Sequence, residues 1–271
     1  MRVAFQGEWG AFSEQAICEY FGQVETFPCE TFEQVFTAVA ARQAEAGLIP
    51  IENSLAGSIH QNYDLLLKYH LFIVGEHFLR VRLCLIAFPG VEIDRIRKVI
   101  SHPQALAQSA RYLQRLGIKT EPVYDTAGSV KMLRAMGERS VAAIASRRAA
   151  EIYDMQVLAE GIEDEDKNYT RFLVIHPEAN RPRGKTKTSI VFTLNHRPGA
   201  LFKALSVFAL RDINLTKIES RPLPGKPWEY LFYVDLVGSI EDEHVERALE
   251  HLREYALMLR VFGSYRQAIF E

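Results

Sequence analysis

Short apolar, β-branched runs alternate with longer amphipathic segments through the first two thirds of the chain. The longer segments predict helices, including one to Tyr20 that Ser13 can cap and one that a capping box at Thr31 and Gln34 opens. Strands that alternate with helices indicate an α/β fold with a mainly parallel sheet. The apolar runs predict strands at residues 3–5, 47–51, 71–74, 81–87, 96–100, 140–145 and 172–175.

Three local features refine this pattern. A single helix is predicted over residues 103–116, on which Gln108 shares a face with Ser101. Residues 75–80, between two predicted strands, are expected to cross between two lobes. Pro50 has no N–H to give to a strand ladder, so the sequence places it at a sheet edge or at a strand end.

The pattern changes after residue 175. Residues 176–185 combine two prolines, a glycine and several charges, as expected of a linker. The elements that follow are predicted in the order β-α-β-β-α-β, the ferredoxin-like split unit, whose open sheet edge a second copy of the chain can cover. The predicted domains are residues 1–180, with a second lobe at about 79–155, and residues 186–271.

Composition excludes several classes of protein. Hydrophobic residues make up 48% and charged residues 24%, and the formal charge is -2, so no global field favours nucleic acid or an anionic membrane. No apolar run approaches the ~20 residues that span a bilayer, and the first residues enter a strand without a signal-peptide layout. Cys18, Cys29 and Cys84 are few and scattered, which predicts free thiols in the cytoplasm, with no disulfide framework and no zinc site.

Polar residues lie where predicted strands stop, and open α/β sheets bind ligands outside the carboxyl ends of their strands. The glycine-rich loop at residues 7–13 fits either an anion site at a helix start or a tight turn, and its glycine spacing excludes a dinucleotide fingerprint. The polar cluster at residues 168–171 precedes its own strand. It therefore meets the other loops only if that strand runs antiparallel to them or returns from a second lobe. The acidic run at residues 163–166 favours a solvated loop over a metal site.

Six short motifs along the chain are weak singly but specific in this order. Through them, nearly the whole chain resembles prephenate dehydratases that carry a C-terminal ACT regulatory domain. Because no chorismate mutase segment precedes Val3, it resembles the monofunctional form. The motifs are Gly7-Glu8-Trp9-Gly10-Ala11-Phe12-Ser13, Pro50-Ile51-Glu52-Asn53-Ser54, Ser101-His102-Pro103-Gln104, Asn168-Tyr169-Thr170-Arg171-Phe172, Gly199-Ala200-Leu201-Phe202 and Glu219-Ser220-Arg221-Pro222.

The resemblance implies a two-lobed catalytic domain of the periplasmic-binding-protein type (type II), followed by a ferredoxin-like βαββαβ ACT domain. It implies conversion of prephenate to phenylpyruvate in L-phenylalanine biosynthesis, with L-phenylalanine as a feedback effector bound between ACT domains. It further implies no cofactor, no metal and a homodimer or homotetramer paired through the ACT domains. Two alternatives stay open, an arogenate dehydratase, whose substrate carries an amine, and a non-catalytic two-lobed ligand-binding or sensor protein.

Site residues carry over by motif in three groups. The expected catalytic residues are Glu52, Asn53, Ser101, Gln108 and Thr170. The expected substrate-binding residues are Ser54, Arg171 and Phe172. The expected phenylalanine-binding residues are Gly199, Ala200, Leu201, Glu219, Ser220, Arg221 and Pro222.

The reaction favours neutral hydrogen-bond donors at the leaving hydroxyl. Thr170 can supply one directly or through water, unless its hydroxyl only bonds backbone at the strand start. A cation held against the ring carboxylate would slow decarboxylation, so Arg171 suits the side-chain carboxylate or a structural clamp. Glu52 is either a general acid or, as we favour, an acceptor that holds its loop. His102 is expected to be a local packing residue.

Overall fold

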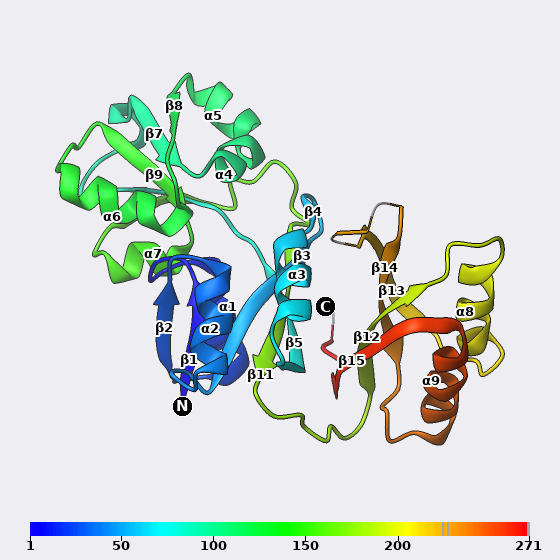
Figure 1. Ribbon diagram of the computed structural model, residues 1–271. Helices are drawn as coiled ribbons and strands as arrows, with labels where there is room; N and C mark the ends of the chain where they lie inside the picture. The colour runs from blue at the N-terminus through cyan, green and yellow to red at the C-terminus, as the bar shows by residue number, and fades with distance from the viewer. Residues whose placement is uncertain (224, 227, 270–271) are drawn as a thin grey trace. The chain divides into compact units, whose positions relative to one another are not determined.

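Three β-sheets organise the protein, two of them in the first two thirds of the chain (Figure 1). The structure is a computed structural model that describes residues 1–223, 225–226 and 228–269. The chain divides into two compact units. One consists of Met1–Lys68 with His77–Leu173, and the other of Tyr69–Glu76 with Val174–Glu271.

The first sheet forms the N-terminal lobe. Its strands lie in the order β2-β1-β3-β11-β5, with the short β4 paired to β3, and β2, β1 and β3 are parallel. The buried side chains of this lobe include Phe5, Ile17, Phe36 and Leu66. The elements are β1 (Arg2–Gln6), α1 (Phe12–Phe21), β2 (Glu25–Cys29), α2 (Phe32–Ala40), β3 (Ala46–Asn53), β4 (Gly57–Ser58), α3 (His60–Lys68), β5 (Phe72–Arg80) and β11 (Tyr169–His176).

The second lobe is a mixed sheet in the order β10-β6-β9-β7-β8. Strands β8, β7 and β9 are parallel, and β6 runs antiparallel to both β9 and β10. Alternate residues of β9, such as Ala143 and Ile144, face two different buried clusters, which explains the continuous apolar run. The elements are β6 (Cys84–Ala87), a 3-10 turn (Ile93–Arg95), β7 (Lys98–Ser101), α4 (Pro103–Gln108), α5 (Ala110–Leu116), β8 (Lys119–Pro122), α6 (Thr126–Met136), β9 (Val141–Ala145), α7 (Arg147–Ile152) and β10 (Gln156–Glu160).

One predicted helix cap is confirmed and one is wrong. Thr31 caps α2 in a complete capping box with Gln34. Ser13 does not cap α1, because Ala11 stands at the N-cap and makes no side-chain hydrogen bond. Instead, the Glu14 carboxylate accepts the Gly10 N–H at 2.7 Å.

Three further predictions about the lobes are wrong. The helix over residues 103–116 breaks at Ser109, whose buried hydroxyl donates to the Ala105 carbonyl at 3.0 Å. Residues 75–80 belong to β5 rather than to a crossing. Pro50 lies inside a central strand, but the register of β3 with β1 ends at Leu48, so the missing N–H removes no bond to β1.

The C-terminal domain is a four-stranded antiparallel sheet in the order β13-β14-β12-β15. Two helices pack on it around buried Phe192, Phe208 and Leu249. The predicted βαββαβ order is confirmed, and with it the fold class of two α/β lobes plus a ferredoxin-like domain. The elements are β12 (Thr186–Leu194), α8 (Ala200–Ala209), β13 (Leu215–Pro222), β14 (Tyr230–Val237), α9 (Glu243–Tyr255) and β15 (Ala256–Arg266).

Residues 69–76 belong to the C-terminal unit, although β12 begins about a hundred residues later in the chain. The buried Glu76 carboxylate forms an ion pair with buried Lys187 at 2.9 Å. A Cβ at Gly263 would lie 2.4 Å from the carbonyl oxygen of Ile73, so only glycine lets the two backbones approach this closely. A domain boundary at residue 180 would separate these partners.

We therefore expect a chain that ends at Asn180 to unfold at a lower temperature than the full chain. Truncation removes Lys187 and Gly263, which contact residues 69–76. Gly263→Val in the full chain should reproduce part of the loss, because it forces the same backbones apart. Thermal unfolding followed by circular dichroism measures both effects. Equal midpoints for the truncated and full chains would instead support independent domains that divide at residue 180.

Candidate active site

The polar loops of the first lobe meet at one end of its strands. Because β2, β1 and β3 are adjacent and parallel, their carboxyl ends all lie at that end of the sheet. The amino end of β11 lies there too, since the Ser54 N–H donates to the Tyr169 carbonyl at 2.8 Å. The Tyr169 N–H donates in turn to the Ser54 hydroxyl at 2.9 Å. The convergence that the sequence left conditional is therefore present.

Asn53 organises this meeting point. Its side-chain Oδ1 accepts the N–H groups of Leu55 and Ala56 at 3.0 and 2.9 Å, which fixes the orientation of the amide. Its Nδ2 then faces β11 and donates to the Asn168 Oδ1 at 2.8 Å and to the Thr170 hydroxyl oxygen at 3.0 Å. The Thr170 hydroxyl thus accepts from a side chain, which differs from the alternative in which it only bonds backbone.

Gln108 joins the cluster from the second lobe. Its Oε1 accepts from the Asn168 Nδ2 at 3.1 Å. Asn168 therefore connects the predicted catalytic residue Gln108 to Asn53, which itself bonds Thr170 directly. No role was predicted for Asn168 from the sequence. Its place at the head of the Asn168–Phe172 motif is the signal that could have identified it.

The other predicted residues differ in their environment. Ser101 is fully buried at the end of β7 and donates to the Ile144 carbonyl at 2.6 Å. Arg171 and Phe172 of β11 are buried, with 7% and 2% of their surface exposed. Glu52 is half-buried and pairs in register with Ser58 of β4.

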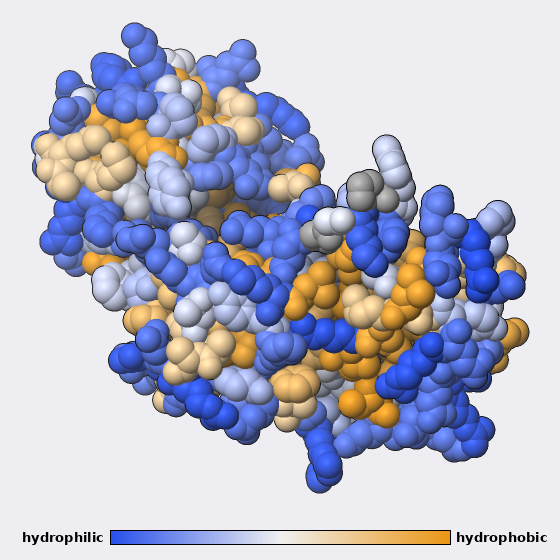
Figure 2. Space-filling model, viewed as in Figure 1, coloured by the Kyte–Doolittle hydropathy of each residue, from blue (hydrophilic) through white to orange (hydrophobic). Residues whose placement is uncertain are grey.

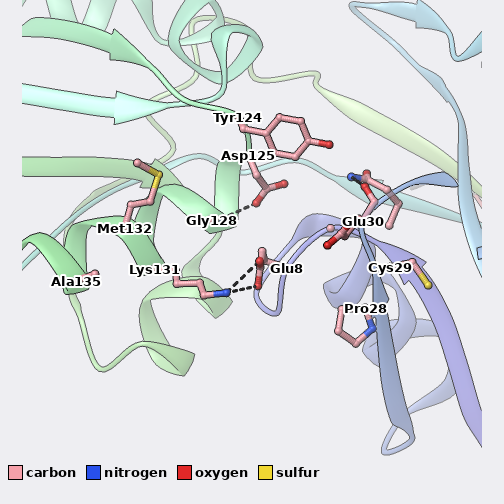
Figure 3. A pocket seen from close by; sticks show the side chains of 12 residues that line it. Glu8, Pro28, Cys29, Glu30, Tyr124, Asp125, Gly128, Lys131, Met132 and Ala135 are labelled. Atoms are coloured by element: carbon pink, nitrogen blue, oxygen red, sulfur yellow. Dashed lines mark hydrogen bonds and ion pairs between the residues drawn. The ribbon is translucent and has the colours of Figure 1, made fainter. Parts of the chain in front are cut away.

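A cavity of about 550 Å³ opens at the carboxyl ends of β1 and β2 (Figure 3). Glu8 and Glu30 line it from the first lobe, and Tyr124 and Asp125 line it from the start of α6. Burial raises the pKa of Asp125, although the Gly128 N–H donates to its carboxylate. Of the described residues that the sequence predicts as catalytic, none lines this cavity.

Two ion pairs join the lobes beside this cavity. Lys131 of α6 contacts the Glu8 carboxylate at 3.0 Å on the exposed side (Figure 3). Arg148 of α7 donates to the buried Glu14 carboxylate through Nε at 3.0 Å and Nη2 at 3.2 Å. A Cβ at Gly10 would lie 2.6 Å from the Ala149 Cα, so this glycine permits close contact between the lobes.

These contacts bear on the two interpretations of the glycine-rich loop. The Gly7 and Ala11 N–H groups donate to the carbonyls of Cys29 and Glu8, and the Gly10 N–H donates to Glu14. Internal acceptors already bind these three donors, as expected of a tight turn.

The acidic run has a structural role. Asp164 accepts the Arg111 N–H at the start of α5 at 3.1 Å, and Glu163 accepts the Leu83 N–H at 2.9 Å. These carboxylates hold the chain between the lobes. Within the described ranges, no group of three or more His, Cys, Asp or Glu side chains could hold a metal ion. The described helices are all too short or too polar to cross a membrane.

The predicted effector site in the C-terminal domain is partly outlined by the structure. Gly199 has a φ of +75° and stands at the N-cap of α8, and a Cβ there would meet open space. A small cavity of about 110 Å³ lies beside it, lined by Ala200 and Leu201 together with Asn195 and Arg197. Residues 219–222 end β13 and do not line this cavity within the described part of the chain.

Comparison with known families decides the assignment. Residues 3–180 match the family described as prephenate dehydratase, and residues 188–254 match the ACT domain. The chain belongs to the prephenate dehydratase family. Membership confirms the predicted enzyme class, a carbon–oxygen lyase, and the predicted ACT domain.

Similar proteins come from plants. The Arabidopsis thaliana protein named arogenate dehydratase/prephenate dehydratase 2, chloroplastic, is 50% identical over 276 residues, with 98% of this chain and 72% of that protein covered. Arogenate dehydratase 2 of Petunia hybrida is 48% identical over 281 residues, with 98% and 71% covered.

Two solved structures show the same fold throughout. Prephenate dehydratase from Arthrobacter aurescens, in complex with L-Phe, superposes with a TM-score of 0.90 at 32% identity, covering 98% of this chain and 90% of that one. GqqA, described as a novel type of quorum-quenching acylase, superposes with a TM-score of 0.93 at 35% identity, covering 99% and 98%.

The relatives contradict the predicted cytoplasmic location. Arabidopsis proteins that are 50% and 47% identical to this chain are named as chloroplastic. The prediction relied on the few, unpaired cysteines, which report on redox conditions and do not distinguish one reducing compartment from another.

Proposed function

We propose that the protein is a prephenate dehydratase that forms phenylpyruvate. Its reacting groups lie where the carboxyl end of β3 meets the amino end of β11. The observation that supports this site most directly is the bond from Asn53 Nδ2 to the Thr170 hydroxyl oxygen at 3.0 Å. Because Thr170 uses its oxygen as the acceptor, its own proton stays available. No other hydrogen-bond partner of that hydroxyl is found among the described residues.

The chemistry needs such a donor. In prephenate, the bond to the ring carboxylate breaks, carbon dioxide leaves, and the electron pair enters the ring as the bond to the ring hydroxyl breaks. The departing hydroxide takes up a proton and leaves as water, and aromatisation drives the reaction. A donor held where negative charge develops stabilises the transition state more than the ground state. Thr170 supplies that hydrogen bond, directly or through a water molecule that delivers the proton.

Arg171 suits recognition of the side-chain carboxylate. A guanidinium binds a carboxylate through two parallel hydrogen bonds. At the ring carboxylate, the same cation would oppose decarboxylation, because that charge disperses as the reaction proceeds. Ser54 holds the loops together through Lys167 and Tyr169. Ser101 is buried and bonded to the Ile144 carbonyl. Both serines are therefore proposed as structural groups, and Glu52 is proposed to hold its loop.

The acylase description of GqqA raises a second candidate, because the two folds match over almost the whole chain. Cleavage of an acyl bond commonly uses an activated nucleophile. Cys29 is the cysteine at the cavity, but burial raises the pKa of its thiol to about 11, which leaves it protonated near neutral pH. No histidine lines that cavity within the described residues. These observations favour the dehydratase.

Substrate choice is tested by kinetics. Several relatives are named for arogenate and others for both substrates. We propose prephenate as the preferred substrate, so kcat/KM measured for the two compounds should be higher for prephenate. A higher value for arogenate would reassign the substrate and leave the reaction type unchanged.

We also propose that L-phenylalanine binds between two ACT domains and inhibits the enzyme. The related dehydratase from Arthrobacter aurescens is described in complex with L-Phe. In this chain, β13 is an edge strand, with exposed Ile218 on it and exposed Phe202 on the neighbouring helix α8. Apolar surface is visible over this sheet in Figure 2. Pairing of two β13 edges would give a homodimer and satisfy the open hydrogen-bonding groups of that edge.

Gly199→Val is expected to abolish phenylalanine binding and to leave basal turnover intact. The left-handed φ of +75° is strained for a β-branched residue, and the added side chain would occupy the space where the effector approaches the backbone. Calorimetry with millimolar L-phenylalanine and rate assays measure the two effects. No heat of binding and no inhibition in the unmodified protein would leave the ACT domain only a pairing role.

A further inference from the structure

Asn168 lies where both crossings between the two lobes meet. It is fully buried, and its backbone carbonyl accepts the Val81 N–H at 2.8 Å. Val81 lies between β5 and β6, on the first crossing, and Asn168 lies between β10 and β11, on the second. Its side-chain amide joins Asn53 of β3, in one lobe, to Gln108 of α4, in the other. One residue therefore contacts both lobes and both crossings.

The amide groups form a chain with a fixed direction. Because Asn53 Oδ1 accepts the N–H groups of Leu55 and Ala56, its Nδ2 must point toward Asn168. Asn168 therefore presents Oδ1 to Asn53 and Nδ2 to Gln108. Gln108 must accept with Oε1, so its Nε2 is the last group in this series of amides.

This direction determines which groups remain available to a ligand. The Thr170 hydroxyl accepts from the Asn53 Nδ2, so it can donate its own proton. Gln108 is half-buried, and its Nε2 has no hydrogen-bond partner in the part of the chain that the structure describes. The hydrogen-bonded amides thus present a donor at each end, the Thr170 hydroxyl and the Gln108 Nε2. A leaving hydroxide needs donors.

We infer that Asn168 is a positioning residue that fixes Gln108 as a donor in addition to Thr170, a role that rests on the proposed dehydratase function. An amide is required at this position because it accepts on one side and donates on the other. A carboxylate would accept on both sides. Gln108 would then turn its Nε2 toward residue 168 and present an oxygen to the site, which reverses its polarity.

Asn168→Asp tests this inference, because the variant keeps the shape of the side chain and replaces the amide donor by an acceptor. It also adds a buried negative charge when ionised, which the control variant below shares. We expect kcat to fall about tenfold at neutral pH, the equivalent of one lost hydrogen bond, with a smaller change in KM. The protonated carboxyl restores one donor and one acceptor. The kcat of the variant relative to the wild type should therefore recover as pH falls through the pKa of the new carboxyl. Both side chains that face it, Asn53 and Gln108, are neutral, and the neighbouring Lys167 and Arg171 are common to both proteins.

Asn62→Asp is the matched control. Asn62 is equally buried, and its Nδ2 donates to the Pro50 carbonyl at 2.6 Å, away from the amide chain. This variant should lose stability but show a kcat that follows the wild-type pH profile. A ratio of Asn168→Asp to wild-type kcat that stays constant with pH would overturn the inference.

Hydrogen exchange gives a readout that needs neither turnover nor the Asp variant. Loss of the Asn168 side chain removes the shortest of the three hydrogen bonds that the Asn53 Nδ2 makes, which loosens the Asn53 amide. The Leu55 and Ala56 N–H groups that it holds should therefore exchange faster in Asn168→Ala, by up to about tenfold. They should exchange at the wild-type rate in Asn62→Ala. Unchanged exchange in Asn168→Ala would refute the amide chain, even in a protein without dehydratase activity. If the wild type is inactive but Asn168→Ala still exchanges faster, the proposed function and the donor role are both refuted. Only the structural link between Asn168 and Asn53 then remains.

Discussion

Replacing Thr170 by alanine is expected to lower kcat at least about hundredfold, because one preorganised donor contributes ~3 kcal/mol to transition-state stabilisation. The fold should persist. The Asn53 Nδ2 that donates to Thr170 also has the Asn168 Oδ1 at 2.8 Å and the Tyr169 carbonyl at 3.2 Å as acceptors. The change therefore strands no buried donor, and urea unfolding should show a nearly unchanged free energy.

Two further substitutions at Thr170 separate the effect of the hydroxyl from the effect of the rest of the side chain. Thr170→Ser keeps the hydroxyl and should retain much of the activity. Thr170→Val keeps the shape without the hydroxyl and should behave like Thr170→Ala. Full activity in Thr170→Val would remove this hydroxyl from the mechanism.

Glu14→Ala is expected to cost about 3 kcal/mol of unfolding free energy, because it removes one partner from an ion pair that joins the two lobes. The Glu14 side chain is 3% exposed, and its carboxylate also accepts from the Gly10 N–H and the Thr26 hydroxyl. The 35% exposure of the Arg148 side chain places the expected cost at the lower end for buried pairs. Urea unfolding measures it.

The exposed pair between Lys131 and Glu8 supplies the control. Its side chains are 56% and 38% exposed, so Lys131→Ala should change the unfolding free energy by at most about 1 kcal/mol. A cost for Glu14→Ala as small as that of Lys131→Ala would show that the buried pair does not hold the lobes together.

The Glu14 contribution should also depend on pH. Burial alone would raise the pKa of Glu14, but hydrogen bonds from Arg148, Gly10 and Thr26 outweigh it, so the pKa lies below its ordinary value. The contribution is therefore complete above the ordinary carboxyl pKa of about 4.3 and disappears as pH falls through the lowered value. The stability difference between wild type and Glu14→Gln should narrow over that acid range.

The sequence predicted strands correctly where a continuous apolar run determines the structure. The run at residues 140–145 forms β9 because the apolar side chains from Val141 to Ala145 are continuous and end at a helix cap. Strands β2 and β10 escaped prediction because they lie at sheet edges, where pairing with β1 or β6 substitutes for an apolar pattern. Pro28 within β2 is tolerated at such an edge.

Tertiary contacts decided the rest. The break at Ser109 depends on a side-chain bond to Ala105 that competes with the helix. The assignment of residues 69–76 to the C-terminal unit depends on partners such as Lys187 and Gly263, more than a hundred residues away. At the candidate site, the motifs predicted Asn53, Thr170 and Gln108, but only the geometry shows that the Asn168 side chain joins Asn53 to Gln108.

The most direct test of the proposed function is a rate measurement on the purified protein with prephenate at neutral pH. Phenylpyruvate is followed by its absorbance in alkali, and phenylalanine formation from arogenate is followed in parallel. We expect phenylpyruvate to form well above the uncatalysed background in the wild type and to approach that background in Thr170→Ala. Background rates with both substrates, together with hydrolysis of an N-acyl amide by the same preparation, would contradict the dehydratase assignment and favour an acylase.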